Sequence, residues 1–330
     1  MSEISSAAAV DAPLDAPVDA VVIGRNEGER LRACLQSLRG QVRRVVYVDS
    51  GSSDGSVALA RGLGALVVLL DAAQPFTAAR ARNAGLAALM RDAPEFVQFV
   101  DGDCAVDGQW IATARAFLTA HPRAAVVCGR RRERFPAASV YNRLCDREWD
   151  TPMGQVRACG GDALMRFAAV RAAGGYRDDL IAGEEPELCL RLARAGGQIW
   201  RIDAEMTLHD AAMQRFGQWW RRSRRAGHAF AEGAALHGAG PERHWVAETR
   251  RALLWGLGVP VAALGLALLW HPAAILLVLV WPLQVARLSR RLGWQAAVFA
   301  VLGKLAEAQG VLAYWARRVA GRRARIIEYK

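Results

Sequence analysis

Two carboxylates separated by one glycine directly follow an apolar run in FVQFVDGDCAV, residues 96–106. Asp101 and Asp103 would repel each other and resist the loss of water at the end of a buried strand, so the pair needs a compensating partner. Two carboxylates on a tight turn can share one divalent cation, and Gly102 lets the backbone bend and a ligand approach. A cation held in this way can bridge to a diphosphate. The alternative is a solvated loop that carries two acids, because the motif is short and common.

Other residues could hold the rest of a phosphate-bearing ligand. Asp49 ends a β-branched run in VDSGSSDGS. A carboxylate there can accept a hydrogen bond from the N3–H of a uracil, although Asp, Gly and Ser also build ordinary turns. Arg80 and Arg82 in ARARNAG are two positions apart on a predicted helix. They do not share a face, so we expect only one of them to reach a diphosphate. The alternative is a solvated basic helix.

A second acidic group stands in GEEPELCLRLARAGG, where Glu184, Glu185 and Glu187 fall at the start of a predicted helix. The helix dipole favours acids there, and Pro186 suits a first turn, so capping is one explanation. Capping does not need three acids, however. A carboxylate that faces the Asp101 turn could act as a general base.

His209 follows a predicted strand and could be a further metal ligand or a structural histidine. Further along, QWWRR at residues 218–222 combines aromatic and cationic side chains. Such a run could bind a phosphate, or it could lie on a membrane as an amphipathic helix.

The elements that must position these residues alternate between strands and helices. Strands are expected at 19–24, 43–49, 65–70 and 96–101, and helices at 28–40, 57–64 and 78–92. This alternation predicts an α/β domain with a mostly parallel, Rossmann-like sheet, in which ligands bind at the carboxyl ends of the strands. Asp49 and Asp101 both stand at that edge. Later elements are less regular, with strands expected at 124–131 and 198–203 and a helix at 184–197.

Composition restricts the function classes. The chain has 330 residues, is 53% hydrophobic and carries a formal net charge of +11. Residues 1–204 hold equal numbers of basic and acidic residues, so the whole excess lies in residues 205–330. Basic clusters there flank apolar runs, which favours an anionic lipid surface over nucleic acid. The six cysteines have no C-x-x-C spacing, which fits a reducing cytosol better than a disulfide framework or a zinc site.

The ends of the chain differ from the α/β region. Residues 1–18 are acidic and rich in Ala, Pro and Ser, which predicts a disordered tail rather than a signal peptide. Residues 252–270 and 273–286 are uncharged on either side of His271-Pro272. They predict either a membrane hairpin or two tilted, half-buried helices. Arginines flank both ends, and the positive-inside tendency favours a hairpin with both ends at the cytoplasmic face. The segment 294–315 looks interfacial, or packed on the other helices.

Taken in order, the motifs resemble the family 2 glycosyltransferases with the GT-A fold. The resemblance covers about residues 19–230 and rests on VVIGRNEGERLRACLQSL, VDSGSSDGS, ARARNAG, VDGDC, CGGDALMRF, GGYRDDLIAGEEPEL and HD followed by QWWRR. It implies a nucleoside-diphosphate sugar donor, most simply a UDP-sugar, a divalent metal (Mn²⁺ or Mg²⁺) and inverting transfer by direct displacement.

The resemblance also assigns roles to individual residues. Asp103 is the expected direct metal ligand, with Asp101 and His209 beside it, and Glu185 stands at the position of the general base next to Glu184. The expected nucleotide-sugar-binding residues are Asn26, Glu27, Asp49, Arg80, Arg82, Asp101, Gly161 and Arg221.

One departure from the family pattern concerns processive synthesis. QWWRR is similar to the Q-x-x-R-W motif of processive members, but Arg222 stands where Trp would be. We therefore expect transfer of one sugar to a membrane lipid, a lipid-linked acceptor or a glycan. The glycosyltransferase domain is expected at 19–240 and a membrane-associated helical region at 241–330.

Two other readings compete with this one. A catalytically inactive nucleotide-sugar-binding protein on the same scaffold is the main alternative. A nucleotide-dependent oxidoreductase would carry G-x-G-x-x-G after the first strand, where this chain has GRNEG.

Overall fold

The computed structural model describes residues 17–321. The disordered tail predicted for residues 1–18 lies outside the described residues except for its last two, and Val18 already begins the first strand. The strands are β1 (Val18–Gly24), β2 (Arg44–Asp49), β3 (Leu66–Leu69), β4 (Phe96–Asp101), β5 (Cys104–Val106), β6 (Ala124–Glu133), β7 (Gly154–Val156), β8 (Ala163–Arg166) and β9 (Gln198–His209).

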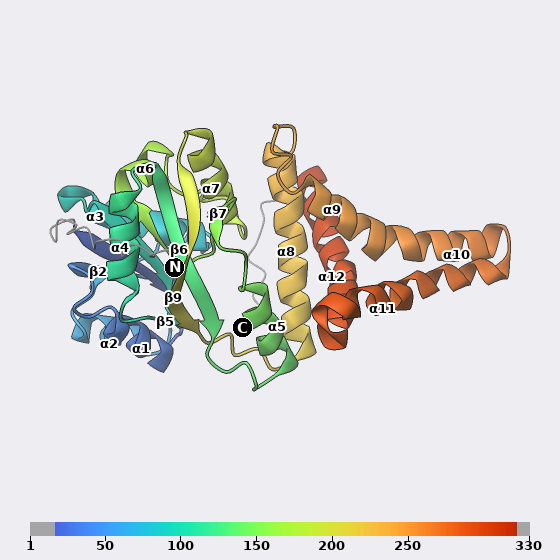
Figure 1. The fold of residues 1–330 in the computed structure, drawn as a ribbon, viewed down its shortest axis with the longest axis horizontal. Helices are drawn as coiled ribbons and strands as arrows, with labels where there is room; N and C mark the ends of the chain where they lie inside the picture. The colour runs from blue at the N-terminus through green and yellow to red at the C-terminus, as the bar shows by residue number, and fades with distance from the viewer. Residues whose placement is uncertain (1–16, 322–330) are drawn as a thin grey trace, which may run out of the picture.

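Helices cover the sheet and form the C-terminal part (Figure 1). They are α1 (Glu29–Ser37), α2 (Ser56–Gly62), α3 (Ala78–Leu89), α4 (Trp110–Ala120), α5 (Val140–Glu148), α6 (Phe167–Ala172), α7 (Glu184–Arg194), α8 (Phe216–His237), α9 (Val246–Leu253), α10 (Val259–Leu269), α11 (Val280–Leu292) and α12 (Trp294–Val319). Short 3-10 or π-helical segments are η1 (Met90–Asp92), η2 (Leu254–Gly258) and η3 (Pro272–Leu279).

The first half of the sheet is parallel. Its strand order begins β3-β2-β1-β4, and each of these neighbours pairs in parallel. From Ala20 to Ile23, β1 is apolar and buried, as expected for a parallel strand covered on both faces. Val21 is fully buried, and a Cβ added to Gly85 of α3 would lie 2.3 Å from its Cγ1, so this helix packs directly on the strand. The predicted α/β alternation is confirmed here.

The second half of the sheet is mixed. Beyond β4 the order continues β8-β6-β9-β5, and β7 also pairs with β9. β8 is antiparallel to both β4 and β6, whereas β6 and β9 are parallel. The three-residue strand β5 runs antiparallel to the end of β9, and this places Cys104 opposite His209. No element was predicted at residues 104–123, which contain β5 and the 11-residue helix α4. A strand as short as β5 has no readable periodicity, whereas α4 was missed.

The C-terminal helices pack against α8. Figure 1 shows α8 beside the sheet domain, with α12 running along it. Glycines allow close approach, since a Cβ added to Gly310 would lie 2.0 Å from the Arg224 carbonyl oxygen. A Cβ added to Gly227 would likewise lie 2.0 Å from the carbonyl oxygen of Glu307. α12 is therefore packed on another helix, as predicted. The boundary at residue 240 falls just after α8, and we retain it as a proposal.

α10 and α11 project from this base as a hairpin (Figure 1). The chain reverses at Trp270 and His271, so both arms return to the same side of the molecule. Leu268, Leu269 and Trp270 at the tip are 75%, 90% and 80% exposed. Within residues 17–321, three helical stretches are long and apolar enough to cross a membrane: Val246–Leu269, Pro272–Leu292 and Trp294–Val319. Of the two predicted arrangements, the structure shows the hairpin.

Candidate active site

β4 delivers Asp101 to the edge of the sheet, and the backbone turns immediately after it. The Gly102 N–H donates to the Ile23 carbonyl oxygen at 2.8 Å, and a Cβ on Gly102 would lie 3.1 Å from that oxygen. The turn separates the two carboxylates. Asp101 is partly exposed and contacts arginines, whereas Asp103 is buried and faces His209. The repulsion expected between them is therefore balanced by two different sets of partners.

Three carboxylates surround the buried guanidinium of Arg82, which lies in α3. Its guanidinium lies 2.7 Å from Glu184 Oε1, 3.0 Å from Glu185 Oε1 and 3.0 Å from Asp101 Oδ1. Burial alone would lower the pKa of Arg82, but Glu185, Asp101 and Glu184 together raise it, so the side chain stays charged. The end of β4 and the start of α7 are thereby tied together.

The structure separates the three glutamates of α7. Glu187 points away from the site and pairs with Arg191 at 2.7 Å and His237 at 3.0 Å. Glu184 is buried against Arg82, and Glu185 follows it. Burial and the neighbouring Glu184 raise the pKa of Glu185 to about 7. A carboxylate with such a pKa suits proton transfer near neutral pH.

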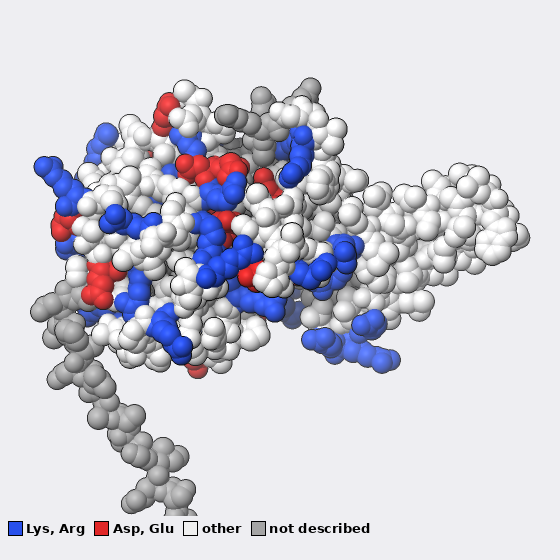
Figure 2. Space-filling view, turned by 90° about the horizontal axis from the view of Figure 1, so that it is seen from above, with Lys and Arg blue, Asp and Glu red and all other residues white. Residues whose placement is uncertain are grey.

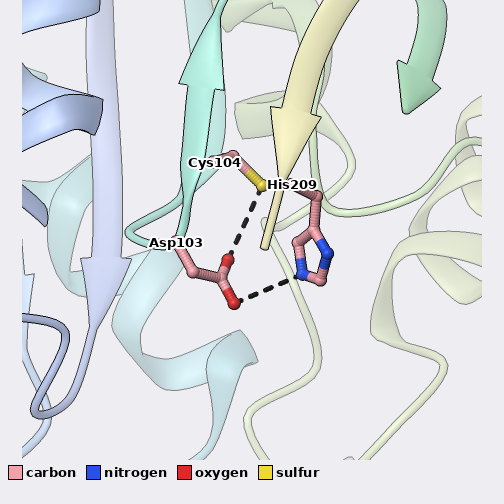
Figure 3. A group of neighbouring side chains, drawn as sticks. All are labelled: Asp103, Cys104 and His209. Carbon is pink, nitrogen blue, oxygen red and sulfur yellow. Dashed lines mark hydrogen bonds and ion pairs between the residues drawn. The ribbon is translucent and has the colours of Figure 1, made fainter. Parts of the chain in front are cut away.

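His209 connects the Asp103 carboxylate to a second buried acid. Its Nε2 lies 3.2 Å from Asp103 Oδ2 (Figure 3). Its Nδ1 lies 3.5 Å from Glu133 Oε2. Burial and the positive charge of Arg131 lower the pKa of His209. A neutral imidazole that is oriented by a carboxylate through its other nitrogen is the usual arrangement of a metal-binding histidine.

Sequence reasoning missed two residues that contact Asp101, namely Arg131 and Asp162. Arg131 in β6 lies 3.3 Å from Asp162 and 3.5 Å from Asp101, and its guanidinium stacks 4.8 Å from the centre of the Trp149 ring. Asp162 accepts the Asp101 backbone N–H at 3.1 Å and the Thr207 hydroxyl at 2.7 Å. The available signal was a run of arginines at the end of one strand and an acid directly before another.

Asp49 lies under the loop that follows β2. Its Oδ1 accepts the Tyr47 hydroxyl at 2.9 Å, and its Oδ2 accepts the backbone N–H groups of Gly51 and Ser52 at 2.9 and 2.8 Å. The carboxylate is 2% exposed. Asp49 therefore stabilises the loop by accepting its backbone N–H groups, and contact of Asp49 with a nucleobase stays a prediction.

Asn26 and Glu27 lie on the lining of a cavity, and nucleotide binding by them stays a prediction. Asn26 has a left-handed backbone with φ 56°, and its side-chain oxygen accepts the Ser53 N–H at 2.8 Å. This bond fixes the β1 loop against the β2 loop. Glu27 lies 2.8 Å from Arg30.

The two arginines of α3 diverge, as their spacing predicted. Arg82 faces the site, whereas Arg80 donates to the carbonyl oxygens of Gln74 and Pro75 at 3.1 and 2.6 Å. Arg80 thus holds the loop before α3, and the structure does not bring it to the Asp101 cluster.

Gly161 fits tightly against the cluster. A Cβ there would lie 2.6 Å from Arg82 Nη2 and 2.9 Å from Asp101 Oδ2. On α8, Arg221 is exposed, and Arg225 rather than Arg221 lies on the cavity lining. The difference follows from helix rotation, which the motif alone does not specify.

Two cavities meet at this cluster. One of about 530 Å³ is lined by Asn26, Glu27 and Asp103, and a neighbour of about 480 Å³ is lined by Gly161 and Glu185. Both are lined by Asp101, Arg131, His209 and Arg225. Figure 2 shows acidic and basic side chains gathered in the middle of the globular part. The arrangement provides adjoining spaces for two substrates.

Comparison with known proteins identifies the domain. The sequence model of glycosyl transferase family 2 matches residues 19–170. The chain carries a family 2 glycosyltransferase domain. It is 30% identical over 210 residues to the pre-mycofactocin glycosyltransferase of Mycobacterium tuberculosis, a match that covers 59% of this chain and 43% of that protein. It is 27% identical over 193 residues to the succinoglycan biosynthesis protein ExoA of Rhizobium meliloti, covering 54% and 58%. The chain thus spans about half the length of these relatives.

Solved structures agree on the fold of the glycosyltransferase domain. The mannosyltransferase PcManGT from Pyrobaculum calidifontis, in complex with GDP-Man and Mn²⁺, superposes with a TM-score of 0.62 at 23% identity, covering 89% of this chain and 86% of that one. S. aureus TarS 1–349 superposes with a TM-score of 0.52 at 16% identity, covering 91% of each chain. The predicted GT-A fold is confirmed.

The glycosyltransferase domain has side chains suited to a divalent cation. Neighbouring ligands of an octahedral cation at ~2.1 Å are about 3 Å apart. Asp103 Oδ2 and His209 Nε2 are 3.2 Å apart and point toward one another (Figure 3). A carboxylate and a neutral imidazole are ligands that Mn²⁺ accepts. These two residues therefore fit the predicted metal site.

Proposed function

We propose that this glycosyltransferase is a metal-dependent inverting enzyme. It transfers one sugar from a nucleoside-diphosphate sugar, most simply a UDP-sugar, to a lipid-linked or glycan acceptor. The observation that carries the proposal is the position of Glu185. It lies in the second cavity, 3.0 Å from Arg82, which also holds Asp101 at the border of the first cavity. A base on the acceptor side of a shared boundary is what direct displacement requires.

The residues divide the reaction between the two cavities. The first cavity binds the donor. The nucleobase of the donor lies near Asn26 and Glu27, and its diphosphate lies near Asp103. Asp103 and His209 would hold the cation, which supplies positive charge for the leaving diphosphate. Glu185 takes the proton of the acceptor hydroxyl as the new C–O bond forms and the bond to the diphosphate breaks. Because attack comes from the opposite side, the anomeric configuration inverts.

Arg82 positions Glu185 without removing its basicity. It also binds Glu184 at 2.7 Å, so its charge is divided between two glutamates and Asp101. A single close Arg–carboxylate pair would lower the pKa of the base strongly. The shared pairing holds Glu185 in place while its pKa stays raised, at about 7.

The second cavity supports an acceptor that is partly apolar. Its wall includes Trp149 directly after α5, Met213 before α8, Phe230 in α8 and Trp245 directly before α9. α8 packs against α12 and α9, from which the hairpin extends (Figure 1). We therefore propose a lipid or lipid-linked acceptor that reaches the cavity from the cytoplasmic face of the inner membrane. No nucleic-acid partner is proposed.

Single transfer is supported by the pairing of Arg222. Its guanidinium binds Glu148 at 2.7 Å, so the position that would hold the Trp of a processive enzyme forms an ion pair with α5 instead. An ion pair offers no flat surface for a growing glycan to stack on.

A donor panel tests the proposal against a catalytically inactive binding protein. The full chain in detergent is incubated with UDP-sugars and GDP-mannose, each with Mn²⁺ or Mg²⁺, and thermal shift identifies the donor. GDP-mannose belongs in the panel because the similar mannosyltransferase was solved with it. Release of nucleoside diphosphate is then measured with and without membrane lipid extract. Acceptor-stimulated release supports the transferase, whereas tight binding with no release under either condition supports the inactive scaffold.

A further inference from the structure

We propose that Cys104 is a third ligand in the cation site, and that this site therefore captures Zn²⁺ in a form that blocks donor binding. The inference rests on the proposed cation site of Asp103 and His209. It adds a residue that the C-x-x-C criterion overlooks, because Cys104 joins an acid and a histidine rather than a second cysteine.

Strand pairing brings the thiol to the site. β5 and β9 are antiparallel, and Cys104 lies directly opposite His209 in their register. Directly opposed residues project from the same face of a sheet. Asp103 precedes Cys104 and reaches toward both (Figure 3). The short strand β5 and the end of β9 therefore bring three different ligand types together, although His209 lies far along the chain.

The separations suit a tetrahedral zinc site. Asp103 Oδ1 lies 3.6 Å from Cys104 Sγ, and Asp103 Oδ2 lies 3.2 Å from His209 Nε2. Zn–S near 2.3 Å and Zn–O or Zn–N near 2.1 Å, with tetrahedral angles, give separations of about 3.6 Å and about 3.4 Å. One ligand atom from each of the three residues lies within 4.8 Å of the others. The sulfur lies near one Asp103 oxygen and the imidazole near the other. A cation held by a single oxygen therefore requires a rotation of the carboxylate and a closer approach of the sulfur and the imidazole.

The surrounding charges favour a dication near this thiol. Cys104 also belongs to a second group, with Asp101 and Asp162, whose ligand atoms lie within 4.8 Å of one another. Arg131 opposes these acids but lies 3.3 Å from Asp162 and 3.5 Å from Asp101, so its charge is shared between them. Within the residues that the structure describes, Cys104 is the cysteine that occurs in both groups.

A thiol ligand changes which metal the site prefers and how many coordination positions that metal keeps for the diphosphate. Oxygen and imidazole ligands accept Mn²⁺ and Mg²⁺, whereas a thiolate selects Zn²⁺, Co²⁺ or Cd²⁺. An octahedral Mn²⁺ on Asp103 and His209 keeps four positions, enough for two diphosphate oxygens and water. A tetrahedral Zn²⁺ on three protein ligands keeps one position. Zinc bound through Cys104 therefore cannot chelate a diphosphate through two oxygens, and it competes with the productive metal.

Cobalt absorption tests this directly, without an activity assay. The full chain in detergent is titrated with Co²⁺ in the absence of nucleotide. We expect a near-ultraviolet sulfur-to-cobalt charge-transfer band and strong visible bands from four-coordinate cobalt, saturating at one Co²⁺ per chain. Cys104→Ser should lose the near-ultraviolet band, and Cys104→Ala serves as a second variant if serine perturbs folding. The matched control Cys128→Ser, a buried cysteine in β6, should keep it.

Competition then tests the choice of metal. An equimolar addition of Zn²⁺ should remove the cobalt bands, whereas an excess of Mg²⁺ should leave them. Zn²⁺ should also weaken Mn²⁺-supported UDP binding at least about tenfold in the wild type and much less in Cys104→Ser. Asp103-dependent Co²⁺ binding without a sulfur band would overturn the role of Cys104 and leave the Asp103–His209 site intact. Failure of Mn²⁺ and Co²⁺ alike to bind through Asp103 would overturn the proposed metal site and this inference with it.

Discussion

The Glu185 carboxylate lies 3.0 Å from the Arg82 guanidinium, and Arg82 is 2% exposed. A buried arginine that holds a catalytic carboxylate usually makes it a weak base. Here the same arginine also binds Glu184 and Asp101, so Glu185 is fixed in position but receives only part of the charge.

Glu185→Gln should lower transfer by about 10² to 10⁴, the usual contribution of a general base. The amide keeps the size of the side chain but cannot take the acceptor proton, whereas the proposed donor site is the other cavity. We therefore expect near wild-type donor affinity, measured by calorimetry beside single-turnover transfer rates. Normal turnover in Glu185→Gln together with loss in Glu184→Gln would assign the base to Glu184.

The transfer rate should rise with pH and level off above about 7. Burial and Glu184 raise the pKa of Glu185 to about 7, so the carboxyl is protonated and inactive as a base below that pH. The folded state therefore binds more protons than the unfolded state between the ordinary carboxyl pKa and about 7, and ionisation of Glu185 lowers stability over this range as pH rises.

Two profiles measure this effect. The rate profile of the wild type should show the inflection near pH 7, and the unfolding free energy of Glu185→Gln should lose the corresponding slope. A rate profile that is flat from pH 5 to 8 is incompatible with Glu185 as the titrating base.

Asp103→Ala should abolish metal-dependent nucleotide binding without unfolding the domain. The carboxylate provides the proposed oxygen ligand beside His209, and its loss leaves a cation only the imidazole and the Cys104 thiol. A chelator should have the same effect on the wild type. The readout is Mn²⁺-dependent UDP affinity, with circular dichroism as the check on folding. The control is Asp203→Ala, which removes an exposed acid on the same strand as His209. Unchanged metal-dependent affinity in Asp103→Ala would reject this ligand.

The exposed tip of the hairpin should carry membrane association. Replacing Leu268, Leu269 and Trp270 with serine removes apolar surface that is at least 75% exposed. We expect weaker binding to liposomes of bacterial lipid extract and unchanged UDP affinity, because the tip is remote from the cavities. Leu69→Ser is the control. It removes one leucine side chain at a 58% exposed position on β3 and should leave flotation unchanged. Equal flotation of all three proteins would show that another surface binds the membrane.

The sequence predicted those parts of the site that depend on local pattern. Apolar runs that end in Asp49 and Asp101 placed both at the sheet edge, and the spacing of Arg80 and Arg82 predicted that they diverge. Contacts between strands that are far apart in the sequence could not be predicted from local pattern. Arg131 contacts Asp101 because β8 and β6 follow β4 in the strand order. The pairing of these strands is mixed rather than purely parallel, which the local pattern does not reveal. A motif alone could not select Arg225 over Arg221, since the rotation of α8 depends on its packing with α12.

That packing gives the last prediction. Gly310 of α12 contacts α8 so closely that a Cβ would lie 2.0 Å from the Arg224 carbonyl oxygen and 2.7 Å from the His228 nitrogen. Both are backbone atoms, so neither can rotate away. Gly310→Ala should therefore separate the helices, lower the melting temperature and weaken UDP binding, because Arg225 on α8 lines the donor cavity. Gly265→Ala on α10 is the matched control, since no atom lies within 4 Å of its added Cβ. Helix propensity alone favours alanine over glycine by about 1 kcal/mol, so the control should be neutral or stabilised. Differential scanning fluorimetry and UDP titration of both variants measure the effect. If Gly310→Ala melts like the control and binds UDP normally, the close α8–α12 contact does not position the site.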